Sequence, residues 1–203
     1  LRYLGWEECC VKTLKTQRTL FFASERYLSR KEYQKLLKTA EQENVRLARI
    51  METICTTGIR ISELNFVTVE ALKKGRVEIT NKGKTRTIFL APSLNMKLTD
   101  YCWRRAICSG PVFITAGGKT LDRSNIWSDM KRLCDKAGVD AHKVFPHNLR
   151  HLFACTYYEM EKDLVHLADL LGHSSIETTR VYTKVPAMAQ CENMEKIRTL
   201  LSE

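Results

Sequence analysis

Hydrophobic positions recur at helical spacing between residues 29 and 42, where Leu36 and Ala40 fall on one face. Ser29 precedes this stretch and Glu32 follows it by three residues, the sequence of a capping box. The pattern predicts a helix that begins just after Ser29.

The next stretch, from about Asn44 to Thr57, has the same spacing and predicts a second helix. Gly58 is expected to end it, because glycine readily takes the left-handed conformation found after helices. The side chains expected to be buried are Val45, Ala48, Ile50, Met51 and Ile54.

The pattern changes over residues 75–90. The β-branched runs "RVEIT" and "TRTIFL" flank "NKGK", which predicts a β-hairpin with a lysine-rich tip. A further short strand is expected at "VFIT", residues 112–115.

The remaining pattern is again helical. Asp122 is expected to cap a helix that ends at Gly138, and Asp163 one that ends at Gly172. Ser174 and Glu177 have the spacing of a second capping box. Further helices are expected over residues 93–106, 147–160 and 187–201. The fold class is therefore mainly α with a small antiparallel β-sheet (α+β).

Charge points to the kind of partner. The formal net charge is +10, with 33 Lys and Arg against 23 Asp and Glu, which favours a polyanion such as nucleic acid. A basic protein without such a partner is the alternative. No hydrophobic run approaches the roughly 20 residues that span a bilayer, so we expect no membrane partner.

The eight cysteines form no CxxC pair and have no zinc spacing. Most stand among helical hydrophobic residues, as Cys55 and Cys155 do. They are typical of small core residues in a reducing compartment. We therefore expect a cytoplasmic protein without a metal site.

Several charged residues do not fit a core role. Arg60 follows a helix stop within "TGIRISEL", where Glu63 could pair with it or orient it toward a phosphate. His147 and Arg150 share a helix face at its start, whereas His151 is expected to pack or cap. Taken singly, each has an ordinary interpretation as a solvated or capping residue.

His173 and Tyr182 complete this set within "LLGHSSIETTRVYTK". Alone, His173 is typical of a helix C-cap and Tyr182 of a packing tyrosine. Together with two arginines they suit phosphodiester chemistry. Arginines offset the charge of a pentacoordinate phosphorus, and a tyrosine hydroxyl can attack it. A lysine can protonate the leaving oxygen, and none of this requires a metal or another cofactor.

At this point the sequence resembles the tyrosine recombinase (phage integrase) family, most nearly the integrases of bacterial mobile elements and the Xer-like recombinases. The matching segments are "TGIRISEL", "NKGKTRTIFL", "FPHNLRHLFA" and "LADLLGHSSIETTRVYTK". They follow the family's order over roughly residues 28–186.

The resemblance implies a role for six residues. Arg60 and Arg150 are the two catalytic arginines, and His147 is the histidine of the HxxR motif. His173 belongs to the LGH motif and Tyr182 is the nucleophile. Lys82 is the general acid of the hairpin, although Lys84, two residues away, is an alternative that spacing does not exclude.

The resemblance also implies the tyrosine recombinase catalytic-domain fold, with a small three-stranded sheet, and three regions. Residues 1–27 are expected to be the end of a missing amino-terminal core-binding domain and a linker. Residues 28–186 form the catalytic domain. Residues 187–203 form a carboxy-terminal helix that packs on a neighbouring subunit or on its own core. The apolar positions expected in that helix are Met188, Met194, Ile197, Leu200 and Leu201.

The implied function is site-specific DNA recombination, or integration, through a 3′-phosphotyrosyl intermediate, as in mobile genetic elements. The implied partners are double-stranded DNA with inverted-repeat core sites and three more copies of the chain in a tetramer on DNA. A monomer is possible in solution. Residues suited to DNA contact are Lys84, Arg86, Lys119 and Arg123.

Two other functions share much of this evidence. A type IB topoisomerase uses the same tyrosine chemistry to nick and reseal one strand, but the hairpin and "LLGHSS" favour a recombinase. A non-catalytic DNA-binding relative would not need all six residues in order.

Overall fold

The computed structural model describes residues 26–183, except 82 and 116, together with residues 197 and 198. Ala23–Thr183 form one compact unit, and all the elements named below belong to it. The helix predicted over residues 187–201 lies outside the described residues apart from residues 197 and 198, which are helical. The region predicted over residues 1–27 is likewise almost entirely outside them.

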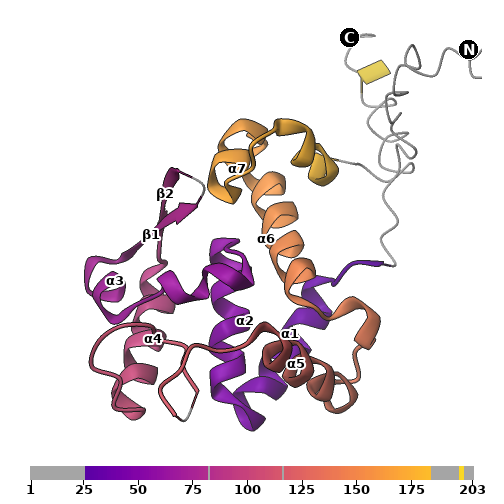
Figure 1. Ribbon diagram of the computed structural model, residues 1–203. Coiled ribbons are helices and arrows are strands. Elements are labelled where there is room, and N and C mark those ends of the chain that lie inside the picture. The colour runs from indigo at the N-terminus through magenta and orange to yellow at the C-terminus, as the bar shows by residue number, and fades with distance from the viewer. Residues whose placement is uncertain (1–25, 82, 116, 184–196, 199–203) are drawn as a thin grey trace, which may run out of the picture. The chain divides into compact units, whose positions relative to one another are not determined.

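Seven α-helices, four 3-10 helices and two strands occur in the described part of this unit (Figure 1). The α-helices are α1 (Arg30–Glu43), α2 (Val45–Thr57), α3 (Val69–Lys74), α4 (Pro92–Arg104), α5 (Arg123–Ala137), α6 (Pro146–Glu161) and α7 (Leu164–Leu171). The strands are β1 (Arg76–Asn81) and β2 (Lys84–Phe89), and the 3-10 helices are η4 (Ile61–Phe66), η5 (Ala141–Lys143), η6 (Ile176–Thr178) and η7 (Arg180–Thr183). The predicted fold class is confirmed.

Local capping explains where the helices begin and end. The capping box of Ser29 and Glu32 is present at the start of α1. The Asn44 side chain accepts from the amide of Leu47 at the start of α2 (3.1 Å), and Gly58 ends α2 in the left-handed conformation. These contacts join residues only a few positions apart, so the sequence pattern was sufficient to predict them.

The core is built around α2, which contacts α1, α4, α5 and α6. Four of the five side chains predicted to be buried in α2 are buried. The prediction for the fifth, Val45, is wrong, because its side chain is 45% exposed. Val45 is the first residue of α2 and lines a surface pocket with Tyr101 and Arg105. Arg104, the last residue of α4, lines the same pocket, so α4 borders Val45 and leaves it open to solvent.

The hairpin is antiparallel, from the pair Arg76–Phe89 to the pair Asn81–Lys84. The described part of the chain forms a two-stranded sheet, smaller than the three strands that the resemblance implied. Residues 112–115 do not form a strand. Among them only Ile114 takes part in an isolated bridge, with Thr120, and a second bridge joins Thr68 to Pro111 just before them. That second pairing does not extend, because Pro111 has no N–H and the chain turns into α3 at Val69.

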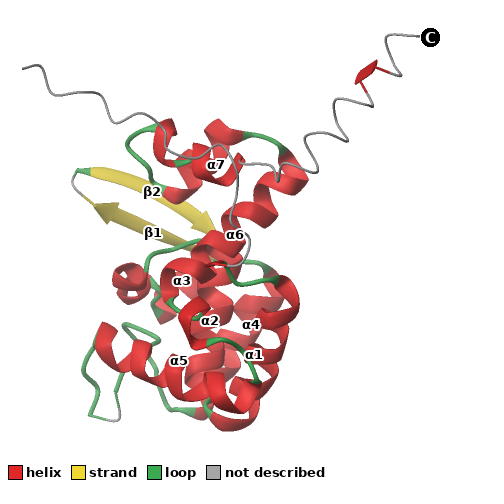
Figure 2. Ribbon diagram, turned by 90° about the vertical axis from the view of Figure 1, so that its right-hand side faces the viewer, coloured by secondary structure: helices red, strands yellow, loops and turns green. Residues whose placement is uncertain are grey.

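The hairpin and α7 lie at the same end of the unit, as both views show (Figure 2), and α7 contacts β2. The predicted capping box at Ser174 is wrong. Instead the Ser175 hydroxyl accepts from the Glu177 amide (3.2 Å), and two short 3-10 helices follow. The Thr178 hydroxyl also donates to the Ser175 carbonyl (2.6 Å), and such local bonds compete with a regular helix.

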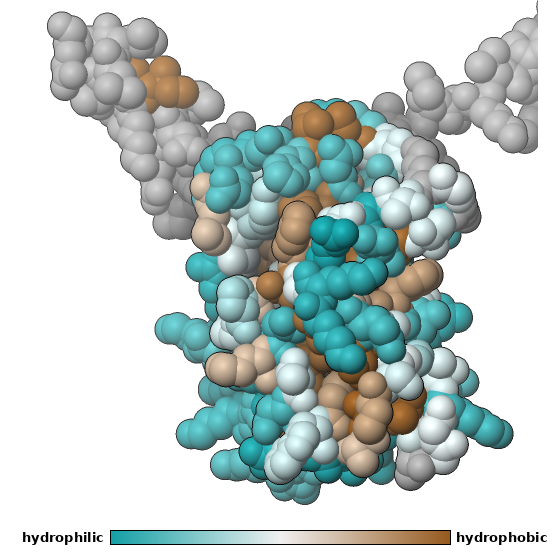
Figure 3. Space-filling model, turned by 90° about the vertical axis from the view of Figure 1, so that its left-hand side faces the viewer, coloured by the Kyte–Doolittle hydropathy of each residue, from teal (hydrophilic) through white to brown (hydrophobic). Residues whose placement is uncertain are grey.

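The side of the unit that bears the hairpin, α3 and α4 is mostly hydrophilic, with hydrophobic residues showing in spots between the polar ones (Figure 3). Phe89, Met96 and Trp103 are the large exposed hydrophobic residues of β2 and α4. Scattered exposure of this kind is ordinary for a protein surface. Among the helices that the structure describes, none has the length and hydrophobicity needed to cross a membrane.

Candidate active site

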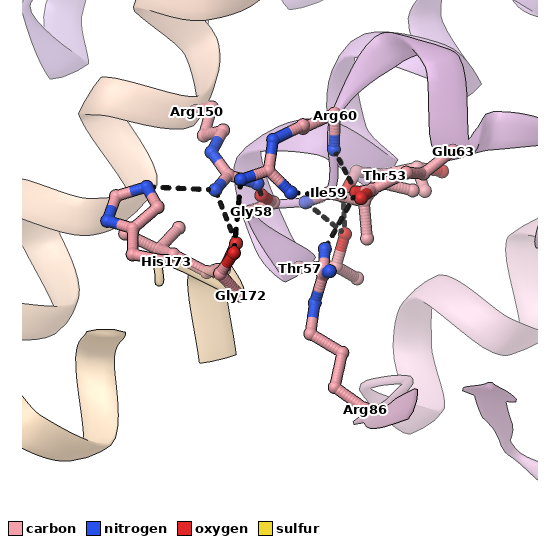
Figure 4. Close-up of polar contacts among 11 residues, drawn as sticks. Thr53, Thr57, Gly58, Ile59, Arg60, Glu63, Arg86, Arg150, Gly172 and His173 are labelled. Atoms are coloured by element: carbon pink, nitrogen blue, oxygen red, sulfur yellow. Dashed lines mark hydrogen bonds and ion pairs between the residues drawn. The ribbon is translucent and has the colours of Figure 1, made fainter. Parts of the chain in front are cut away.

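Three arginines, one glutamate and one histidine converge where α2 and α7 end and where β2 passes them (Figure 4). Gly58 ends α2 and Gly172 ends α7, both with positive φ. A Cβ on Gly58 would lie 2.4 Å from Phe153 of α6, so only glycine lets these two helices approach this closely. The carbonyl groups left free at the two helix ends point into the site.

Arg150 occupies the centre of this cluster and is only 4% exposed. Its guanidinium donates to the carbonyls of Gly58 and Leu171 (the latter at 2.6 Å) and to Nε2 of His173 (3.2 Å). Burial and the neighbouring charge of Arg60 lower the pKa of Arg150 to about 10. It therefore stays protonated at neutral pH, held by the negative ends of two helices.

Arg60 reaches the same place from the chain just after α2. Its Nη2 donates to the Gly172 carbonyl (3.3 Å) and its Nη1 to Oε1 of Glu63 (3.0 Å). The Arg60 side chain is 36% exposed. One arginine of the pair is therefore buried and the other is open to solvent, and Figure 4 shows their guanidinium groups side by side.

Glu63 is the acidic residue of this network and is 2% exposed. Its Oε2 accepts from the Arg60 amide and from Arg86 Nη2, both at 2.7 Å. Burial by itself would raise the pKa of Glu63, but the hydrogen bonds from Arg86 and Arg60 outweigh it and lower that pKa. Arg60, Arg86 and Arg150 against one carboxylate leave an excess of two positive charges, which suits an anion.

His173 is held in one tautomer by its two neighbours. Arginine can only donate, so Nε2 accepts the bond from Arg150, and Nδ1 must carry the proton that it donates to Oγ1 of Thr179 (2.8 Å). Burial and the positive charge of Arg150 lower the pKa of His173 to about 4. The imidazole is therefore neutral at neutral pH.

Tyr182 lies next to His173 and is 6% exposed. The two rings are nearly parallel, with centroids 6.4 Å apart, while His151 meets Tyr182 edge-on at 5.1 Å. Burial raises the pKa of Tyr182, opposed by the positive charge of Arg150. The phenol is therefore protonated in this structure, and the arginines are what would favour its loss of a proton.

The structure thus brings together Arg60, Arg150, His173 and Tyr182, which the sequence singled out. His147, in the first turn of α6, is exposed, and partial desolvation and the charge of Arg150 lower its pKa. His151 packs as expected, since it is buried and its ring stacks on Tyr27 with centroids 3.8 Å apart.

The remaining predicted site residues are the two hairpin lysines and three basic residues expected to contact DNA. Lys82 lies outside the described residues, and Lys84 is the first residue of β2. Lys119 and Arg123 are exposed before and at the start of α5. Arg86, expected to contact DNA, forms an ion pair with Glu63 in this structure.

Sequence reasoning missed two contacts in this site. Thr179, 0% exposed, fixes the His173 tautomer, and nothing in the pattern distinguished it from Thr178. The inward position of Arg86 could have been found, because Arg86 is two residues before Ile88 in β2 and residues two apart share a face of a strand. Within the described residues, no group of three or more His, Cys, Asp or Glu side chains could hold a metal ion.

The fold and this site define the class of protein. The family model described as "Phage integrase family" matches residues 26–188, and the chain belongs to that family, the tyrosine recombinases. It is 32% identical over 180 residues to tyrosine recombinase XerA of Pyrococcus furiosus, covering 85% of this chain and 62% of that protein. It is 36% identical over 151 residues to tyrosine recombinase XerD of Xanthomonas campestris pv. campestris, covering 67% of this chain and 47% of that protein.

Solved structures agree on the fold. The crystal structure of XerA recombinase matches with a TM-score of 0.71 and 28% identity, covering 85% of this chain and 63% of that one. XerH site-specific recombinase bound to its difH substrate, in a pre-cleavage complex, matches with a TM-score of 0.69 and 24% identity, covering 83% and 53%. The chain therefore spans between about half and three fifths of these relatives.

Proposed function

We propose that this chain is the catalytic part of a site-specific DNA recombinase, an integrase. The observation that carries the proposal is that Tyr182 lies against His173, whose imidazole is bonded to the buried Arg150. A nucleophile and an anion site with two excess positive charges are thus present within one chain. This combination suits attack on a phosphodiester without a metal or a high-energy cofactor.

In the proposed reaction the Tyr182 hydroxyl gives its proton to solvent water and its oxygen forms a bond to phosphorus, and the bond from phosphorus to the 5′ oxygen breaks. Arg60 and Arg150 offset the charge on the non-bridging oxygens, with His147 and His173 beside them. Lys82, or alternatively Lys84, gives a proton to the leaving 5′ oxygen. Attack by the 5′ hydroxyl of a partner strand on the 3′-phosphotyrosyl link then releases Tyr182 and joins the exchanged strands.

The proposed partner is double-stranded DNA with inverted-repeat core sites, bound by a tetramer of the chain in the cytoplasm. Support comes from the net charge of +10 and from relatives of the same fold, XerH and the Tn1549 transposon integrase, whose structures contain DNA. Lys84, Lys119 and Arg123 are proposed to contact the DNA backbone. Residues 187–203 are proposed to pack on a neighbouring subunit.

The test uses a nicked suicide duplex that carries the core site from the flanks of the encoding element. We expect a DNA-linked protein band on a denaturing gel, present with a chelator and absent for Tyr182→Phe. Tyr158→Phe is the matched control, because Tyr158 packs against the same hydrophobic cluster as Tyr182 and phenylalanine keeps its ring. It should leave the band unchanged.

Other outcomes of this test would favour a different nucleophile or a different function. A band that persists in Tyr182→Phe would show that another residue is the nucleophile. DNA binding without a band in the wild type would favour a non-catalytic DNA-binding relative. Relaxation of supercoiled DNA that lacks paired sites would favour a type IB topoisomerase.

A further inference from the structure

Arg86 lies on the buried face of the hairpin. In the strand pairing it stands opposite Ile79, and the neighbouring pair on the same face is Val77 with Ile88. These three hydrophobic residues are at most 3% exposed, and the Arg86 side chain is 14% exposed. An inward arginine at a strand position requires a specific partner.

That partner is Glu63, which also holds Arg60. Arg86 Nη2 and the Arg60 amide both donate to Oε2 of Glu63 at 2.7 Å, while Arg60 Nη1 uses Oε1. A carboxylate that is 2% exposed stays ionised only if it keeps a counter-charge. Arg60 is the more exposed of its two partners, so Arg86 is the one that keeps Glu63 charged when Arg60 engages an anion.

Arg86 also packs against the turn that carries His173. A Cβ on Gly172 would lie 2.5 Å from Arg86 Nη1, and Gly172 has a φ of +61°. The carbonyl of the same Gly172 accepts from Arg60. Nε of Arg86 is buried and has no hydrogen-bond partner among the described residues, an arrangement that stability alone would not favour.

We propose that Arg86 is a positioning residue of the active site: it keeps Glu63 ionised and in place, so that Glu63 aims Arg60 at the scissile phosphate. This inference rests on the proposed function. It differs from a DNA-backbone role for Arg86, since the guanidinium acts through Glu63 and does not touch the substrate. Arg86 also joins the hairpin to the turn at Gly172, so that the two elements are held in a fixed arrangement.

The experiment compares two suicide duplexes, one with an ordinary scissile phosphate and one with a methylphosphonate at that position. The methylphosphonate has lost the negative charge of a non-bridging oxygen, so it depends less on a correctly aimed arginine. We expect Arg86→Met to slow covalent-complex formation on the order of 10- to 100-fold with the ordinary phosphate, as for other residues that orient a primary ligand. The defect should shrink with the methylphosphonate, as it should for Arg60→Met.

Arg76→Met is the matched control, because Arg76 is on the same hairpin but is 48% exposed and pairs with Glu78. It should behave as the wild type with both duplexes. Arg86→Lys keeps the charge without the two-pronged guanidinium and should show a smaller defect than Arg86→Met. If Arg86→Met does not fold, the same ratio of rates is measured with Arg86→Lys.

Equal slowing of both duplexes by a folded Arg86 variant would overturn the positioning role and indicate a general structural one. Wild-type rates for Arg86→Met and Arg86→Lys would overturn it as well. A wild type that forms no covalent product with either duplex would instead refute the proposed function, so the two failures are distinguishable.

Discussion

At the scale of single residues, the site depends on side chains that hold other side chains. Arg150 and Tyr182 are proposed to act on the phosphate directly, whereas the tautomer of His173 is set by its contact with Thr179. The hydroxyl of Thr179 is 2.8 Å from Nδ1 and the residue is fully buried. Water is therefore poorly placed to replace this hydroxyl if it is removed.

We predict that Thr179→Val, which keeps the shape and removes the acceptor, slows covalent-complex formation on the order of 10-fold. It should also lower the free energy of unfolding by about 1–3 kcal/mol, because the Nδ1 proton is left without a partner. Thr179→Ser should restore both. Nitrogen chemical shifts of His173 would report the tautomer, and an unchanged tautomer in Thr179→Val would contradict this explanation.

At the scale of elements, the site lies where the carboxyl ends of two helices come close together. α2 and α7 both end in a left-handed glycine, and their last carbonyls accept from Arg150. α6 supplies Arg150, and the close contact between α2 and α6 places it there. Gly58 makes that contact possible, since a Cβ would overlap Phe153.

Gly58→Ala therefore combines two costs. A left-handed alanine costs about 1–3 kcal/mol, and the overlap with Phe153 at 2.4 Å adds about 1–3 kcal/mol of overpacking. Gly75→Ala measures the cost of the left-handed conformation alone. Gly75 has a similar φ of +67° at the end of α3, but nothing lies within 4 Å of its Cβ position. Denaturant unfolding should show the larger loss for Gly58→Ala, and equal losses would mean that α6 moves aside without cost.

At the scale of the whole molecule, a strongly basic chain holds two histidines in neutral form, the buried His151 and the half-buried His173. The pKa of His151 is lowered to about 4 by burial and that of His173 to about 4 by burial and Arg150. In an unfolded chain both pKa values are about 6.5. Between pH 4 and 6.5 the unfolded state therefore binds protons that the folded state does not.

It follows that the free energy of unfolding falls as the pH drops from about 6.5 toward 4. His151→Phe, which keeps a ring to stack on Tyr27, should make this dependence shallower. Denaturant titrations at pH 5 and pH 7, at constant ionic strength, would measure both. The same pH dependence in the wild type and in His151→Phe would show that His151 is not a source of it.

The amino-acid sequence by itself determined the local features, and it singled out residues that come together in the candidate site. The capping box at Ser29, the ends of helices at Gly58 and Gly172, and the hairpin all rest on contacts between residues a few positions apart. Such local contacts do not depend on how the rest of the chain folds, so the sequence pattern predicts them. The order of Arg60, Arg150, His173 and Tyr182 predicted the site because the chemistry of these side chains is unusual in combination.

Only the tertiary structure decided how these residues are partnered. Arg86 pairs with Glu63 across 23 positions, a contact that exists only because the hairpin packs against η4, which carries Glu63. Val45 stays exposed beside a pocket that it lines with residues of α4. The charged guanidinium of Arg150 is held by carbonyls at the ends of two different helices. These outcomes depend on how separate elements meet in space. Hydrogen bonds from Arg86 and Arg60 keep Glu63 ionised, whereas burial favours the neutral forms of His173 and Tyr182.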